Sequence, residues 1–204
     1  MRTFYGMLIQ EKFGSLLKKR IKEIQPVVED VVGIDLGDVQ VLPFQNYISK
    51  VVKDYKKKGI IPSVYTANEL WFYFRLCEFI LHPFAKAESS TIYYNTSPFS
   101  SLFPGRYAWN VGAHELGHVA HHRIINSAHL KSEEKVSEGF ADYIAEHTLE
   151  KICKPATSIT KMRARKFRAL ISKEGFPDSI EGAVSYLHFE HRRNEEKQKL
   201  YDSF

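Results

Sequence analysis

Apolar positions recur at helical spacing through the first part of the chain. Most fall three or four residues apart, at Met7, Phe13, Leu16, Leu17, Ile21 and Ile24. This period predicts an amphipathic helix over 7–24. Proline is favoured at the first position of a helix, so Pro26 predicts a further short helix that ends near Val32. Gly33 and Gly37 then interrupt the helical pattern.

The next segments combine strand and helix patterns. Val39 and Val41 alternate with a polar residue, which predicts a short strand over 38–44. A lysine-rich segment predicts a helix over 46–58. Residues 90–96 are rich in residue types that favour strands and predict a second strand.

Thr66 and Glu69 have the spacing of a capping box, in which each side chain accepts a hydrogen bond from the other residue's backbone N–H. They predict the start of a helix over 67–81. Because apolar side chains occupy nearly all sides of this helix, we expect it to be buried.

Helix patterns dominate the second half of the chain. They predict helices over 108–125 and 133–153, with Asn110 and Ser132 as their capping residues. Helices combined with a few short strands indicate an α+β fold.

We predict a single domain over 1–204, because no linker composition or repeat interrupts the chain. Within it we distinguish an N-terminal helical segment (1–37), a core (38–154) and a C-terminal helical extension (155–204).

The composition narrows the class of protein. With 44% hydrophobic and 26% charged residues, the chain is expected to fold. No apolar stretch reaches the roughly eighteen residues of a transmembrane helix, and the first apolar run is too short for a signal peptide. We therefore expect a soluble, cytoplasmic protein with no membrane partner. Cys77 and Cys153 lack the spacing of a disulfide framework or zinc knuckle, and we expect both to be buried, reduced thiols.

Basic charge is concentrated over 161–168 and 188–199. The chain has 29 Lys and Arg against 24 Asp and Glu, a net charge of +5, and basic blocks can attract nucleic acid. We interpret these segments as solvated helix faces and do not expect nucleic acid as a partner.

The helix predicted over 108–125 contains His114, Glu115 and His118 in an HExxH motif. Two imidazoles four residues apart stand on one helix face within reach of one ion, and the glutamate is turned toward the ion's open position. His121 lies on the same face one turn further on. We predict that neither His121 nor His122 is a ligand, because two more ligands would fill that open position.

A third ligand is expected at Glu138, the twentieth residue after His118. Gly117 on the first helix and Ala141 on the second are small, so the helices can pack closely and the three ligands can converge. A fourth zinc position then remains for water, which is the arrangement of a catalytic site. Asp142 shares a face with Glu138 and suits the role of a carboxylate that accepts the second ring N–H of a ligand histidine.

These motifs resemble those of the gluzincin metallopeptidases, in which a glutamate ligand follows HExxH by about twenty residues. The sequence Glu-Gly-Phe-Ala-Asp-Tyr at 138–143 looks like that of aminopeptidase-N-like enzymes, and the ligand spacing is similar to that of thermolysin. The match covers about residues 88–147, and the compact size looks most like the archaeal minigluzincins. The resemblance implies a small zincin-like catalytic core with a short mixed sheet, an active-site helix and a glutamate helix, plus helices at both ends.

The resemblance also implies an activity, the zinc-dependent hydrolysis of peptide bonds in a peptide or protein substrate. It assigns His114, His118 and Glu138 as zinc ligands. Glu115 becomes the general base, and Asp142 the partner of His114.

Other HExxH families fit less well. Metzincins require a glycine and a third histidine at fixed offsets, where this chain has His121 and Ile124. Peptide deformylase-like enzymes add a cysteine ligand upstream, a context that Cys77 lacks. Repressor-cleaving regulators share the sequence His-Glu-Leu-Gly-His, and Glu134 or Glu138 could serve as their later acidic residue.

The oxyanion that develops during peptide hydrolysis needs a hydrogen-bond donor. We favour Tyr186, on a C-terminal helix that a capping box of Asp178 and Glu181 begins. The alternatives are His188, His191 and Tyr107.

The strand at 91–96 resembles in position the edge strand on which gluzincins bind an extended substrate. Its predicted substrate-binding residues are Tyr93, Tyr94 and Asn95.

Two function classes remain open. One is a zinc-dependent peptidase, and the other is a regulatory metalloprotease-like module that cleaves or binds a repressor or a nucleic-acid-associated partner. The intact ligand set favours the peptidase. A scaffold without turnover is expected to lose Glu115 first, because the base serves catalysis and not folding.

Overall fold

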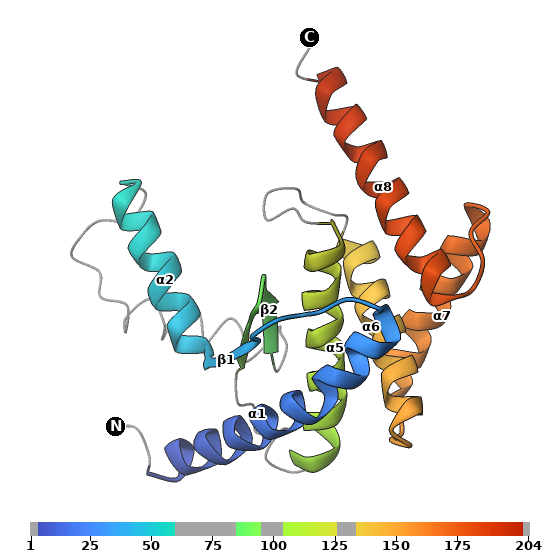
Figure 1. Ribbon diagram of the computed structural model, residues 1–204. Coiled ribbons are helices and arrows are strands. Elements are labelled where there is room, and N and C mark those ends of the chain that lie inside the picture. Colours follow the sequence, from blue (N-terminus) through green and yellow to red (C-terminus); the bar gives the residue numbers. More distant parts are fainter. Residues whose placement is uncertain (1–3, 60–84, 95–103, 126–133, 202–204) are drawn as a thin grey trace.

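The computed structural model describes residues 4–59, 85–94, 104–125 and 134–201 (Figure 1). The elements are α1 (Phe4–Val32), β1 (Gln40–Pro43), α2 (Phe44–Lys57), β2 (Ala85–Glu88), β3 (Thr91–Tyr94), α5 (Pro104–Ile125), α6 (Glu134–Lys151), α7 (Ser158–Lys173) and α8 (Ile180–Tyr201). Helices and a small mixed sheet confirm the α+β class. The predicted helix 67–81 lies outside the described residues, as do Ser132, Asn95 and Cys77.

Helix α1 is continuous, so the prediction of two helices separated at Pro26 is wrong. Proline removes one helical hydrogen bond and costs about 3 kcal/mol. However, Ile24, Val28 and Val32 continue the buried stripe on both sides of it, with exposed fractions of 0%, 0% and 8%. Burying each such side chain contributes about 1.5–3 kcal/mol, which together outweighs the cost of the proline.

The sheet has the strand order β1-β3-β2, with β1 parallel and β2 antiparallel to β3. Strand β3 is therefore central, and its prediction as an edge strand is wrong. The strand predicted over 38–44 corresponds to β1, which is shorter. Strand β2 was not predicted, because the sequence Ala-Lys-Ala-Glu contains no β-branched or aromatic residue.

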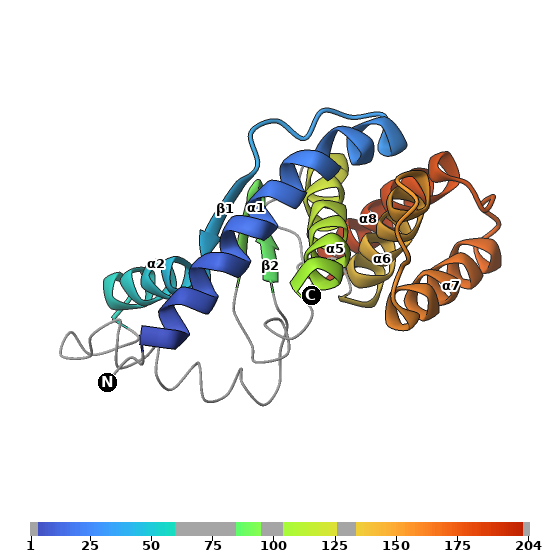
Figure 2. The ribbon, with the colours of Figure 1, turned by 90° about the horizontal axis from the view of Figure 1, so that it is seen from below.

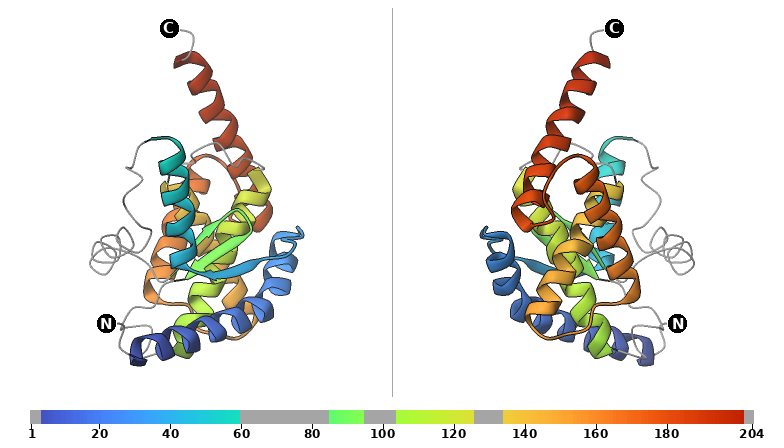
Figure 3. Two further views of the ribbon diagram at one scale, coloured as in Figure 1. Left: turned by 90° about the vertical axis from the view of Figure 1, so that its left-hand side faces the viewer. Right: turned by 90° about the vertical axis from the view of Figure 1, so that its right-hand side faces the viewer.

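Helix α5 lies at the centre of the helical layers. It packs against α1 on one side and α6 on another, α7 covers α6, and β2 lies beside α5 (Figure 2). The C-terminal part of α8 extends beyond the other helices (Figure 3). The element on which the sequence places the HExxH motif is thus surrounded by other elements.

Two predicted capping residues have other roles. Asn110 lies inside α5, which begins earlier, at Pro104. Its side chain accepts a hydrogen bond from the backbone N–H of Thr157 and donates one to the carbonyl oxygen of Pro155, at 2.9 and 3.2 Å. At the start of α8, Ser179 replaces Asp178 as the cap, since its hydroxyl oxygen accepts the N–H of Gly182 at 3.1 Å.

Cys153 is exposed, which contradicts the expectation of a buried thiol. It follows the last turn of α6 with a positive φ of 54°, in the left-handed conformation in which helices commonly end. Within the described ranges, no helix is both long and apolar enough to cross a membrane.

Candidate metal centre

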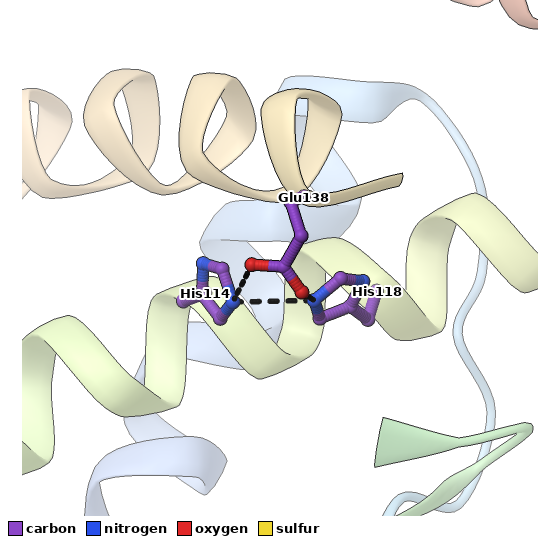
Figure 4. A group of neighbouring side chains, drawn as sticks. All are labelled: His114, His118 and Glu138. Atoms are coloured by element: carbon purple, nitrogen blue, oxygen red, sulfur yellow. Dashed lines mark hydrogen bonds and ion pairs between the residues drawn. The ribbon is translucent and has the colours of Figure 1, made fainter. Parts of the chain in front are cut away.

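Two adjacent helices supply the candidate ligands. His114 and His118 lie one turn apart on α5, and Glu138 points at both of them from α6 (Figure 4). The small residues on the facing sides are in close contact, as the sequence predicted. A Cβ atom built on Gly117 would lie 2.7 Å from the Cα and carbonyl oxygen of Ala141, so only glycine allows this approach.

The ligand atoms of the three residues form a compact triangle. The Nε2 atoms of His114 and His118 are 3.2 Å apart. Glu138 places Oε1 3.2 Å from Nε2 of His118 and Oε2 3.6 Å from Nε2 of His114. All three side chains are partly exposed, so an ion can reach them from solvent. His114, His118 and Glu138 could therefore hold a metal ion.

Both histidines use their second ring nitrogen to contact α6. Nδ1 of His114 lies 3.0 Å from Oδ1 of Asp142, the pairing that the resemblance implied. Nδ1 of His118 lies 3.1 Å from the hydroxyl oxygen of Ser137. When Nδ1 carries the proton and donates it, Nε2 keeps a lone pair for a metal. These contacts favour the metal-binding tautomer of each histidine.

The carboxylates and histidines of the cluster shift the pKa values of His114 and Glu138 in a way that favours their charged forms. Burial lowers the pKa of His114, but the hydrogen bond to Asp142 and the charges of Glu115, Asp142 and Glu138 outweigh it and raise the pKa to about 9. The hydrogen bond to His118 lowers the pKa of Glu138 to about 2, so this carboxylate is ionised at neutral pH. An ionised carboxylate beside two imidazole nitrogens suits a cation.

Glu115 is buried beside the ligands, with 3% of its surface exposed. Burial raises the pKa of its carboxyl, against the charges of His114 and His118 and a backbone hydrogen bond from Ala87 of β2. Its Oε2 atom is buried without a described hydrogen-bond partner. A buried acceptor of this kind is costly unless a ligand or water uses it, which fits a base that accepts a proton.

Helix α7 adds a charged residue that the sequence did not mark. Arg163 places Nη1 2.8 Å from Oε2 of Glu138 and 3.5 Å from Oδ2 of Asp142. Arg168, which also belongs to the basic segment 161–168, forms an ion pair with Glu146 at 2.8 Å. The interpretation of 161–168 as only a solvated face is thus wrong for these two arginines.

Three of the predicted oxyanion donors lie on α8 in different surroundings. Tyr186 is 1% exposed and packs in an aromatic cluster with Phe167, Phe176 and Phe189. His188 is exposed, and His191 lies 3.7 Å from Glu195. The side chain of Tyr107 lies outside the described part of the chain. The catalytic role of Tyr186 stays a prediction, and its observed ring contacts are those of a packing residue.

The predicted substrate residues Tyr93 and Tyr94 are each 6% exposed. Their strand β3 has neighbours on both sides, so its backbone is already paired. Backbone addition of a substrate to β3, as the sequence suggested, is therefore excluded.

Sequence reasoning missed Ser137 and Arg163. Ser137 directly precedes the ligand Glu138, a position from which a side chain can reach the neighbouring helix, so its place in the chain was the available signal. Arg163 gave no comparable signal, because its distance from α6 depends on the turn between α6 and α7.

Comparisons of the chain with protein-family models, with curated proteins and with solved structures found no match.

Proposed function

We propose that this protein is a zinc-dependent peptidase with a zincin-like core, in which α5 is the active-site helix and α6 the glutamate helix. One observation carries the proposal: the ligand atoms of His114, His118 and Glu138 all lie within 4.8 Å of one another, with the buried carboxylate of Glu115 beside them. The resemblance to gluzincins, and to the minigluzincins in size, supports the same activity.

The triangle of ligand atoms fits zinc. Bonds of about 2.0–2.2 Å around a tetrahedral zinc separate its ligand atoms by about 3.3–3.6 Å. The observed separations of 3.2, 3.2 and 3.6 Å lie within or close to that range. Two imidazoles and one carboxylate form a ligand set typical of catalytic zinc, and three protein ligands leave one position for a reacting molecule.

Zinc, when bound, lowers the pKa of a water molecule toward neutrality and polarises the scissile carbonyl. Glu115 then accepts the water proton at its carboxylate and delivers it to the departing amine. Its buried position favours this exchange, because burial raises the pKa of the carboxyl above its ordinary value. His114 and His118 are held in their metal-binding orientation by Asp142 and Ser137.

Strand β2 replaces β3 as the proposed site of backbone recognition. Among the described strands it pairs with β3 alone, so its other side is the sheet edge nearest α5. The backbone of Ala87 already contacts Glu115. An extended peptide that added to this edge would run past the base, with affinity from main-chain hydrogen bonds.

The test compares wild type with Glu115→Gln after zinc reconstitution. Gln is nearly isosteric and makes no metal contact, so we expect the variant to keep its fold and one zinc per chain. Peptide hydrolysis, measured by mass spectrometry on an unbiased peptide library, should fall by ~100-fold or more.

His118→Ala serves as the matched control, since it should lose zinc and activity together. A wild-type protein that binds less than about 0.3 zinc per chain would refute the proposed site. Equal hydrolysis by wild type and metal-loaded Glu115→Gln would refute the role of the base and favour a binding module.

A further inference from the structure

Ser137 lies between two imidazoles of α5. Its hydroxyl oxygen is 3.1 Å from Nδ1 of His118 and 3.4 Å from Nδ1 of His121. His118 is a proposed zinc ligand, whereas His121, the third histidine of the segment, has no part in the ligand triangle. The hydroxyl therefore joins a candidate ligand to a histidine without an assigned role.

Counting hydrogens decides the direction of the two hydrogen bonds that link His118, Ser137 and His121. A serine hydroxyl can donate one hydrogen bond and accept others. If His118 binds a metal through Nε2, its Nδ1 carries a proton and donates it to the Ser137 oxygen. The hydroxyl hydrogen of Ser137 is then free for one acceptor, which is Nδ1 of His121. His121 in turn carries its own proton on Nε2.

The surroundings keep His121 neutral, as this arrangement requires. The side chain is 1% exposed and its ring lies 5.9 Å from that of Phe140. Burial is the largest cause that lowers its pKa, to about 3. A neutral imidazole retains one nitrogen as an acceptor, whereas a protonated one would donate at both.

We propose that His121 is a positioning residue for the zinc ligand His118, acting through Ser137. The inference rests on the proposed metal site and adds two residues to it. His121 fixes the direction of the serine hydroxyl, and Ser137 fixes the tautomer and ring orientation of His118. Asp142 performs the corresponding role for His114, so each candidate ligand histidine has its own partner on α6.

The first experiment determines the tautomers. Long-range ¹H–¹⁵N NMR spectra of the zinc-loaded protein distinguish protonated from unprotonated ring nitrogens. We expect His118 to carry its proton on Nδ1 and His121 to carry its proton on Nε2. A proton on Nδ1 of His121 would overturn the proposal, because that nitrogen could no longer accept from Ser137.

The second experiment measures zinc dissociation constants by chelator competition. Ser137→Ala should weaken binding by ~10 to 100-fold, the usual effect of losing such a partner. His121→Leu removes the acceptor and should weaken binding by about 3-fold or more. His121→Asn should restore binding to within about 2-fold of wild type, because the amide Oδ1 takes the place of Nδ1.

A double variant separates orientation from packing. If His121 acts through Ser137, His121→Leu should have no further effect on zinc affinity in the Ser137→Ala background. His122→Leu, at the next position of the same helix, should leave the affinity unchanged. Additive effects of the two substitutions, or unchanged affinity in Ser137→Ala, would reject the proposal while the metal site itself stands. Failure of wild type to bind zinc would reject both.

Discussion

The close approach of α5 and α6 at Gly117 is the feature on which the candidate metal centre depends most directly. Substitution by alanine would place a Cβ atom 2.7 Å from backbone atoms of Ala141, whereas ordinary van der Waals contact begins at 3.4 Å. Backbone atoms cannot rotate away, so the helices must separate by about 0.7 Å. The separation of Nε2 of His118 and Oε1 of Glu138 would then grow from 3.2 Å to about 3.9 Å.

This change exceeds what a metal site tolerates. Metal–ligand bond lengths in such sites vary by only about 0.2 Å, and a tetrahedral zinc with bonds of about 2.0–2.2 Å separates its ligand atoms by about 3.3–3.6 Å. We therefore expect Gly117→Ala to weaken zinc binding by ~10-fold or more. The cost in unfolding free energy should stay within about 1–3 kcal/mol for overpacking, offset in part by the higher helix propensity of alanine.

Gly112→Ala is the matched control on the same helix. A Cβ atom at that position would meet only side-chain atoms of α1, with Cδ1 of Ile24 nearest at 3.2 Å, and these can rotate. Chelator competition and urea unfolding of both variants provide the comparison. We expect zinc affinity within about 2-fold of wild type for Gly112→Ala. Wild-type zinc affinity in folded Gly117→Ala would show that the helix separation does not set the ligand geometry.

Two further predictions concern the surroundings of the ligands. Asp142→Ala should weaken zinc affinity by ~10 to 100-fold without abolishing it, because it leaves Nδ1 of His114 without the carboxylate now 3.0 Å away; an unchanged dissociation constant would contradict this role. His121 has a folded-state pKa of about 3, below its ordinary value of 6.5, so its contribution to stability is present above pH 6.5 and is lost as the pH falls toward 3. Between pH 7 and pH 5 this loss amounts to about 2 kcal/mol of the free energy of unfolding. In urea unfolding of the metal-free proteins, that free energy should therefore fall less for His121→Leu than for wild type between these two pH values. An equal fall in both proteins would disprove the role of His121.

Local patterns in the sequence were enough to locate most helices. The helix of the HExxH motif, the following glutamate helix and the lysine-rich α2 were all predicted within a few residues of their observed bounds. Spacing also placed Asp142 on the same helix face as Glu138, because residues one turn apart share a face, whereas its pairing with His114 was implied by the resemblance. Where the prediction failed, packing prevailed over local preference. At Pro26, for example, α1 stays helical because Ile24 and Val28, on either side of the proline, are buried.

The sequence by itself determined the candidate ligands, since the HExxH spacing and the small residues Gly117 and Ala141 restrict how two helices can meet. Only the tertiary structure decided which residues from other elements complete the site. The backbone of Ala87 contacts Glu115 from β2, a strand that the sequence pattern did not predict. Arg163 contacts Glu138 from α7, and the position of α7 depends on how it packs against α6. Strand order likewise placed β3 in the centre of the sheet. These contacts join residues that are remote in sequence. They depend on how the helices and strands pack, and local periodicity contains no information about that packing.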